Sequence, residues 1–327
     1  MTTISASAPG KLVLSGEYAV LDGAAAISMA VDRRAIVTIV PREGDCHAVR
    51  APGFSDSETF FTSESGVLSW HAGGKDFALF EQVWVAAGMS LQDSLSFTLD
   101  TRAFRENGTK TGIGSSAALT VALAASMSAI GGAGGAEVAR RAHREFQGGS
   151  GSGVDIANSL AGGVIEYRIG NNTDPGVAWP EGLRCAVYWS GVASDTRSKL
   201  ELLREQRATA ARGALGDAAE QFAAVFREGL VTRILDELDD YKEALRRFDA
   251  DYGLGIFDAG HAHLVDAATA HGVVYKPCGA GGGDVGIALA AAEDSLASFT
   301  EVAGAFGFRR LDMNLDLQGV MLTEEEQ

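Results

Sequence analysis

The stretch TGIGSSAALTVAL, residues 111–123, contains the first group of residues that could do chemistry. Gly112 and Gly114 allow sharp backbone curvature and the close approach of a ligand, while Ser115 and Ser116 add hydroxyls that can bind a phosphate oxygen or Mg²⁺. The first N–H groups of a helix starting here lack internal partners and lie at the positive end of its dipole. The stretch is therefore either a capped, buried helix or a helix whose open end binds an anion.

The same stretch departs from two common nucleotide-binding loops. A Walker A loop has the form G-x-x-x-x-G-K-[ST], with its lysine after the last glycine, whereas Lys110 precedes the glycines here. The G-x-G-x-x-G pattern of dinucleotide-binding loops is also absent from this stretch. If a nucleotide binds, it does so through another architecture.

Two further stretches combine charged residues with glycine. In SAPGKLVLSGEYAVLDG, residues 7–23, Lys11 stands at the start of an expected strand, and Glu17 lies in an otherwise apolar strand where an acid needs a partner. In KPCGAGGGDVGIAL, residues 276–289, five glycines fall between Gly279 and Gly286. Such a density before an apolar strand favours a loop pressed against phosphates or against the first glycine-rich helix, rather than a flexible linker.

A fourth stretch, AHREFQGGSGSGVDIANSLAGG at residues 142–163, contains an acid after a glycine- and serine-rich loop. A carboxylate at Asp155, if it lies near Lys11, could orient an attacking oxygen or accept a proton from it. Asp155 could instead cap a helix that begins with IANSLA. The sequence alone leaves both interpretations open.

Composition and charge limit the classes of protein. The chain has 327 residues, of which 46% are hydrophobic and 21% charged, as in soluble globular proteins of one large or two smaller domains. A net charge of −16 disfavours nucleic acid and anionic membranes, so we expect neither as a partner. Three scattered cysteines without a CxxC pair, and no signal peptide, predict a cytoplasmic protein without disulfides. His261 and His263 are expected to be surface or capping residues.

The pattern of apolar residues predicts mixed α and β structure. Strands are expected at residues 11–21, 35–40, 95–100, 162–169, 184–191, 273–277 and 285–291. Helices are expected at residues 76–87, 115–129, 136–147, 196–245, 261–272 and 293–306. Residues 111–136 carry no charge, but they are mostly glycine, alanine and serine, which favours a buried helix over a membrane span. We predict an α+β protein with two lobes, residues 1–180 and 181–327, and a cleft between them.

Taken together, these stretches resemble the three motifs of the GHMP small-molecule kinases. The first is APGKLVLSGEYAVLDG, the second is GIGSSAA, with Ile113 where leucine is usual, and the third is KPCGAGGGDVGIAL. They occur in the order of the family and span nearly the whole chain. The resemblance implies an N-terminal lobe like ribosomal protein S5 domain 2, a ferredoxin-like C-terminal lobe, and phosphoryl transfer from ATP with Mg²⁺.

Within the family, three stretches are most similar to the branch that acts on 5-phosphomevalonate: KTGIGSSAALTVAL, AHREFQGGSGSGVDIA and YWSGVASDT. This resemblance implies transfer of the ATP γ-phosphoryl group to 5-phosphomevalonate, giving 5-diphosphomevalonate, by a monomer or homodimer. The alternatives are mevalonate kinase, whose His-Gly-x-Pro-Ser-Gly-x-Asp-Asn pattern is not matched, another GHMP kinase, or a non-catalytic ligand sensor on the same fold.

The resemblance also implies roles for individual residues. Lys11 and Asp155 would face the transferred phosphoryl group, with Ser116 as the Mg²⁺ ligand and Glu145 as a weaker candidate for a second one. The residues implied in ATP binding are Lys110, Gly112, Gly114, Ser115, Ser116 and Ala117. The residues implied in substrate binding are Lys11, Lys110, Ser152, Ser194, Gly281, Gly282 and Gly283.

The chemistry of two phosphorylated substrates agrees with these roles. Phosphoryl transfer depends mainly on positioning and on neutralising charge, so Lys11, Lys110, Lys276 and Mg²⁺ are expected to offset the phosphates in an acidic protein. The acceptor is itself a phosphate and is mostly ionised at neutral pH. We therefore expect Asp155 to orient Lys11 and the acceptor rather than to remove a proton.

Overall fold

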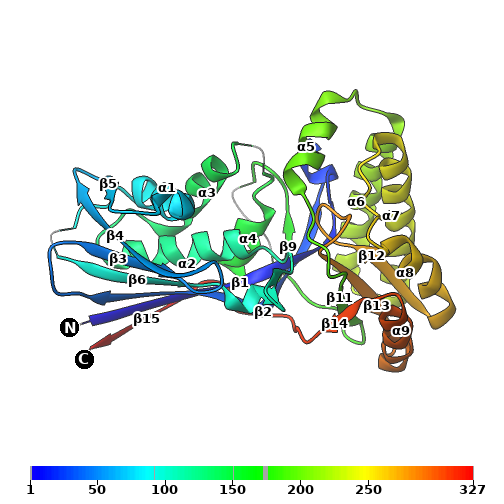
Figure 1. Ribbon diagram of the computed structural model, residues 1–327. Coiled ribbons are helices and arrows are strands. Elements are labelled where there is room, and N and C mark those ends of the chain that lie inside the picture. The colour runs from blue at the N-terminus through cyan, green and yellow to red at the C-terminus, as the bar shows by residue number, and fades with distance from the viewer. Residues whose placement is uncertain (1, 92, 150, 172–175, 327) are drawn as a thin grey trace.

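The computed structural model describes residues 2–91, 93–149, 151–171 and 176–326, which form two lobes side by side (Figure 1). The first lobe is built on a nine-stranded sheet and the second on a four-stranded sheet. This arrangement confirms the predicted α+β class.

Most of the first lobe comes from the N-terminal half of the chain. Its sheet contains β1 (Thr2–Ser15), β2 (Ala26–Pro41), β3 (His47–Ala51), β4 (Ser55–Glu64), β5 (Val67–Trp70), β6 (Leu95–Asp100), β9 (Val164–Tyr167), β10 (Gly176–Val177) and β15 (Met321–Glu326). Its helices are α1 (Ala78–Ala87), α2 (Ser115–Ala129), α3 (Gly135–Phe146) and α4 (Val154–Ala161). Shorter elements are η1 (Ala19–Asp22), η2 (Gly74–Phe77), η3 (Arg102–Phe104), and the hairpin of β7 (Arg105–Glu106) and β8 (Thr109–Lys110).

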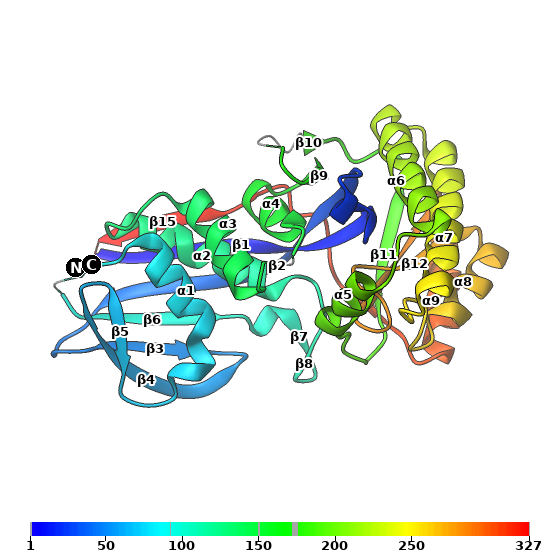
Figure 2. The same cartoon turned by 90° about the horizontal axis from the view of Figure 1, so that it is seen from above.

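Helix α2 is the central helix of this lobe. It packs against β1 and β2 and is flanked by α1, α3 and α4 (Figure 2). Nine of its residues are buried, among them Val121, Leu123 and Met127. An uncharged sequence suits this position because the helix has neighbours on several sides. Among the described residues, no helix is long and apolar enough to cross a membrane.

The second lobe has an antiparallel sheet in the order β12-β13-β11-β14. Its strands are β11 (Arg184–Trp189), β12 (Val273–Pro277), β13 (Val285–Ala290) and β14 (Arg309–Leu311). Its helices are α5 (Thr196–Glu205), α6 (Ala210–Glu228), α7 (Val231–Tyr252), α8 (His261–Ala268), followed by η4 (Thr269–His271), and α9 (Glu293–Ala305). Helices α7, α8 and α9 pack against this sheet, and α6 pairs with α7.

The loop after β1 attaches the first lobe to the second. The Gly16 amide donates to the Tyr241 hydroxyl at 2.9 Å, and the Tyr18 hydroxyl donates to the Ala280 carbonyl at 2.7 Å. Glu17 forms a fully buried ion pair with Lys276 of β12. The partner that the sequence required for Glu17 is therefore a lysine from the other lobe.

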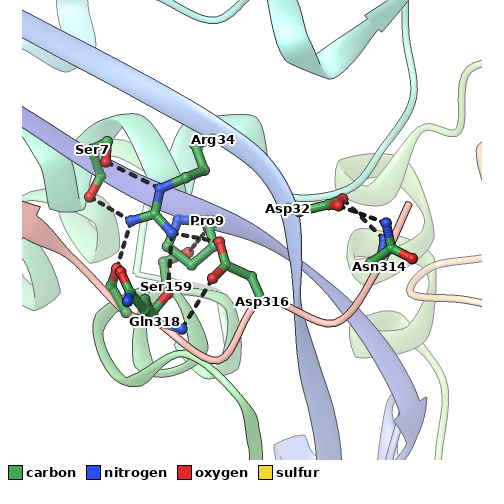
Figure 3. A network of polar contacts seen from close by, with 9 residues as sticks. Ser7, Pro9, Asp32, Arg34, Ser159, Asn314, Asp316 and Gln318 are labelled. Carbon is green, nitrogen blue, oxygen red and sulfur yellow. Dashed lines mark hydrogen bonds and ion pairs between the residues drawn. The ribbon is translucent and has the colours of Figure 1, made fainter. Parts of the chain in front are cut away.

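The C-terminal segment returns to the first lobe, where β15 pairs antiparallel with β1. Residues 312–320 cross between the lobes and are called the C-terminal strap here. Figure 3 shows the polar contacts of Arg34 with this strap. The Arg34 guanidinium contacts the Asp316 carboxylate at 2.5 Å and donates to the Gly319 carbonyl at 2.6 Å. The predicted division at residue 180 therefore needs a correction. Strand β15 lies after residue 180, but it belongs to the sheet of the first lobe, whose other strands all precede residue 180. Residues 172–175, shortly before this predicted division, lie outside the described residues.

Candidate active site

The N-terminus of α2 is an open helix end. The N-cap is Gly114, in the left-handed region with φ of +87°, and no side chain caps the helix. The Ala118 amide makes the first intrahelical bond, to the Gly114 carbonyl at 3.1 Å. Because no side chain satisfies the preceding N–H groups, this geometry favours the anion-binding interpretation over the capped helix.

A cavity of about 440 Å³ opens at this helix end and is lined by residues from both lobes. The sequence-predicted site residues that line it are Lys11, Lys110, Gly112, Gly114, Ser115, Ser116, Ser152, Asp155 and Ser194. Residues from distant parts of the sequence therefore meet where the motifs predicted a phosphate site.

Lys11 lies directly beside the start of α2. Its amide donates to the Ile113 carbonyl at 2.9 Å, which ties β1 to the loop before the helix. Its side chain passes over Gly114, where an added Cβ would lie 3.3 Å from Lys11 Cγ and 3.5 Å from Cε. The ammonium group is thus carried toward the same helix end that offers free N–H groups.

Asp155 lies in the first turn of α4 and lines the cavity. Its carboxylate accepts a hydrogen bond from the Ile156 amide at 3.1 Å, but the N-cap residue is Gly153, so Asp155 is not the cap. The Ser159 hydroxyl of α4 donates to the Pro9 carbonyl of β1 at 2.8 Å (Figure 3). This bond fixes α4 against the strand that carries Lys11.

The two candidate metal ligands differ in their surroundings. Ser116 lines the cavity, and its hydroxyl lies 3.3 Å from Nε2 of the buried His143. Glu145 is exposed and is not among the lining residues. His143 is a residue that the sequence analysis missed, although it lies in the quoted AHREFQ stretch.

The third glycine-rich loop contributes to the cavity through other residues than those predicted. The three predicted glycines do not line the cavity. Gly281 packs against Ile256, Gly282 against Lys199 and Gly255, and Gly283 against the backbone of residues 192–194. The lining residues of this loop are Cys278, Gly279, Ala280 and Asp284. Ala117 of the second motif is fully buried and also does not line the cavity.

Ser194 and Arg197, around the start of α5, both line the cavity. The Ser194 hydroxyl donates to the Gly281 carbonyl at 2.6 Å, and its amide donates to the Asp284 carboxylate at 3.2 Å. Both donors of Ser194 are therefore already used within the protein. Arg197, an exposed cation that the sequence analysis did not single out, offers a phosphate the donors that Ser194 lacks.

The charges in the cavity favour anionic ligands. Its cationic residues are Lys11, Lys110 and Arg197, and none of them forms an ion pair within the described ranges. The acidic residues that line it are Glu17, whose charge is compensated by Lys276, and Asp155 and Asp284, so three cations face two uncompensated carboxylates beside the positive end of α2. The expectation that Lys276 binds phosphates is therefore wrong, because this side chain is fully buried in its ion pair.

Comparisons with known proteins agree with the fold. A phosphomevalonate kinase from Streptomyces sp. (strain CL190) is 32% identical over 350 residues, covering 90% of this chain and 91% of that protein. A mevalonate kinase from Pyrococcus horikoshii is 27% identical over 331 residues, covering 92% of this chain and 93% of that protein. No model of a known protein family matches the chain.

A solved structure of Streptococcus pneumoniae phosphomevalonate kinase in complex with phosphomevalonate and AMPPNP has a TM-score of 0.75 to this protein. The match covers 95% of this chain and 99% of the Streptococcus pneumoniae chain. The sequence identity is 16%, so the comparison shows a shared fold. The relative that is 32% identical over 90% of this chain makes the protein an ATP-dependent small-molecule kinase. The chain belongs to the GHMP kinase family.

Proposed function

We propose that this kinase is a phosphomevalonate kinase, which transfers the γ-phosphoryl group of ATP to the phosphate of 5-phosphomevalonate and gives 5-diphosphomevalonate and ADP. The observation that carries the proposal is a set of three cations in the cavity that form no ion pair with any described residue: Lys11, Lys110 and Arg197. A phosphorylated acceptor adds negative charge to that of ATP. A cavity with several cations in an otherwise acidic protein suits that pair of substrates.

The donor phosphates belong at the start of α2. The free N–H groups after Gly114 and the hydroxyls of Ser115 and Ser116 face the cavity from one helix end. The helix dipole there favours negative charge without requiring a further lysine. Lys11, beside Gly114, then stands where the transferred group leaves the donor.

Mg²⁺ fits the oxygen donors of the cavity. Ser116 and Asp155 both line it, and the described residues contain no cluster of three or more His, Cys, Asp or Glu side chains that would bind a metal alone. Such a sparse set is typical of Mg²⁺, which keeps waters and binds substrate phosphates with one or two protein ligands. When bound, Mg²⁺ neutralises phosphate charge. The exposed Glu145 is not needed for this role.

The acceptor phosphate belongs near Lys110, Ser152 and Arg197. The Ser152 hydroxyl accepts a bond from the Val154 amide at 3.4 Å, and its own hydrogen remains able to reach a ligand. Ser194 could join this group only by giving up its bond to Gly281. Asp155 lines the same cavity as Lys11 and would orient this lysine and the acceptor.

The comparisons support this acceptor without excluding its rival. The phosphomevalonate kinase relative matches over most of both chains, but mevalonate kinases match as well. Mevalonate has no phosphate, so a mevalonate kinase has no use for extra cations at the acceptor position. Mevalonate is therefore the acceptor against which the proposal has to be tested.

The test is ADP release from Mg-ATP with mevalonate, 5-phosphomevalonate or 5-diphosphomevalonate as acceptor. We expect strong turnover only with 5-phosphomevalonate. An Arg197→Gln variant should then raise KM for this acceptor about tenfold or more, as expected for a lost charge-assisted hydrogen bond, and leave KM for ATP nearly unchanged. Turnover with mevalonate alone would overturn the proposed acceptor, and no turnover with any of the three would overturn the proposed reaction.

A further inference from the structure

Asp284, between the third glycine-rich loop and β13, has an unusual backbone. Its φ is +52°, in the left-handed region, although three glycines precede it and a fourth would adopt this conformation without strain. Its amide donates to the Val192 carbonyl at 2.6 Å, and its carbonyl accepts from the Ser190 amide at 2.9 Å. An aspartate held this firmly at a position where glycine would also fit points to a function of its side chain.

The carboxylate of Asp284 contacts both sides of the cleft. On the second lobe it accepts the Ser194 amide at 3.2 Å, just before α5. On the first lobe it lies against Gly112: a Cβ added there would be 2.1 Å from Asp284 Cγ and 2.2 Å from Oδ2. Only glycine at position 112 leaves room for this carboxylate.

The charges around Asp284 show which partners it can serve. Burial raises the pKa of the Asp284 carboxyl, and the Ser194 amide opposes this effect. The charges of Lys11, Lys110 and Lys199 also favour the ionised carboxylate. A carboxylate repels phosphates, so these protein groups are better partners for Asp284 than the anionic ligands of the same cavity.

We propose that Asp284 is a positioning residue, which holds the start of α5 against the loop before α2 and so sets the separation between donor and acceptor. This inference rests on the proposed phosphoryl transfer between two substrates in the cavity. The donor phosphates belong to the α2 end on one lobe, whereas Arg197 of the acceptor site follows Ser194 on the other. An error of about 1 Å between reacting groups can cost roughly 100-fold in rate.

The first test compares Asp284→Gly with Asp284→Asn. Glycine removes the carboxylate but tolerates the left-handed backbone, and asparagine tolerates it too while retaining an oxygen for the Ser194 amide. We expect kcat to fall about 100-fold for Asp284→Gly, and clearly less for Asp284→Asn. The Kd of ATP measured without acceptor should change less than about twofold, because the donor site lies on one lobe. Unchanged kcat in Asp284→Gly, or an equal loss of ATP affinity, would overturn the role.

The second test uses the contact with Gly112. Gly112→Ala strains the backbone, where φ is +76°, and also overlaps Asp284. If the overlap matters, Gly112→Ala should lower kcat more in the unaltered protein than in the Asp284→Gly background. Equal effects in both backgrounds would contradict the contact. The reference is always the acceptor that the unaltered enzyme uses, so a wrong choice of acceptor would be detected separately.

Discussion

Lys11 illustrates how the cavity assembles chemistry from single residues. It stands on β1, yet its backbone bond to Ile113 and its side-chain contact with Gly114 place it beside the start of α2. The strand thus delivers a cation to a helix end that already favours anions. A lysine from a separate strand thus reaches an anion-favouring helix end without a Walker A loop.

The first prediction concerns this lysine. Lys11→Met should lower kcat about 100- to 1,000-fold, because it removes a preorganised charge from the transferred phosphoryl group. Steady-state kinetics with Mg-ATP and the preferred acceptor would measure it. Lys75→Met, at an exposed position outside the cavity, is the matched control and should keep full activity. A Lys11→Met enzyme as fast as this control would remove Lys11 from the mechanism.

The second prediction concerns Asp155. Asp155→Asn should lower kcat roughly 100-fold, because a neutral amide would orient Lys11 and the metal less well. A loss of this size is typical when reacting groups are misplaced by about 1 Å. If the carboxylate orients rather than accepts a proton, the remaining activity should keep the pH dependence of the unaltered enzyme. A changed pH profile would instead indicate a general base. Near-normal turnover of Asp155→Asn would show that the residue has no essential role.

At the scale of elements, regular patterns were predictable and irregular ones were not. The alternation of LSFTLD and the small apolar run from residue 115 predicted β6 and α2 with the observed bounds. Strand β4 was missed because its sequence SDSETFFTSE is mostly polar, and β3 and β5 were missed because they have only five and four residues. The strand expected at residues 11–21 begins earlier and ends at Ser15, followed by a turn onto η1.

The site residues follow the same division. Lys11, inside β1, and Ser116, in the first turn of α2, both line the cavity, as the motifs led us to expect. The roles of Gly281–283 and Lys276 were not predicted, because packing between lobes decides which part of a glycine-rich loop faces a cavity and which charge is buried. Asp284 and Arg197 were missed for the same reason.

The third prediction concerns helix α8, which supports the third loop. Nε2 of His261 lies 3.0 Å from the Gly283 carbonyl and Nδ1 lies 2.8 Å from the Tyr275 hydroxyl. Since a carbonyl can only accept, the neutral ring carries its hydrogen on Nε2. His261 was expected to be a surface or capping residue, but it is fully buried, and the N-cap of α8 is Gly260. Burial lowers its pKa to about 4 from 6.5.

Because the unfolded chain binds this proton more readily, the free energy of unfolding should fall as pH drops from about 6.5 to 4. The loss from His261 alone should reach about 3 kcal/mol near pH 4. Urea unfolding at a series of pH values would measure it. His261→Gln, which keeps one donor and one acceptor but does not titrate, should flatten this part of the curve. An equally steep curve in His261→Gln would contradict the assignment.

The fourth prediction concerns the C-terminal strap. Arg34→Ala should lower the free energy of unfolding by about 2–3 kcal/mol, because it leaves the half-buried Asp316 and the Gly319 carbonyl without their cation. Arg233→Ala, which removes an exposed pair with Glu228, should cost no more than about 0.5 kcal/mol. Equal effects of the two substitutions in urea unfolding would mean that the strap contributes little.

At the scale of the whole molecule, the cavity depends on both ends of the chain. The loop after β1 is fixed to the second lobe by Tyr241, Lys276 and Ala280, and the C-terminal strap returns to the first lobe beside α4. These long-range contacts hold the two lobes around the cavity. The sequence predicted the lobes and the cleft, but the pairing of β1 with β15 joins residues more than three hundred positions apart and has no local signal.

The central claim, that the acceptor is a phosphate, is tested most directly by competition. The enzyme would receive limiting Mg-ATP with mevalonate and 5-phosphomevalonate at equal concentrations, and phosphorus NMR would identify the product. The account predicts a second pair of diphosphate resonances beside that of ADP, loss of the 5-phosphomevalonate monoester resonance, and no loss of mevalonate. Consumption of mevalonate, with growth of the phosphomonoester resonance and ADP as the only new diphosphate, would contradict it.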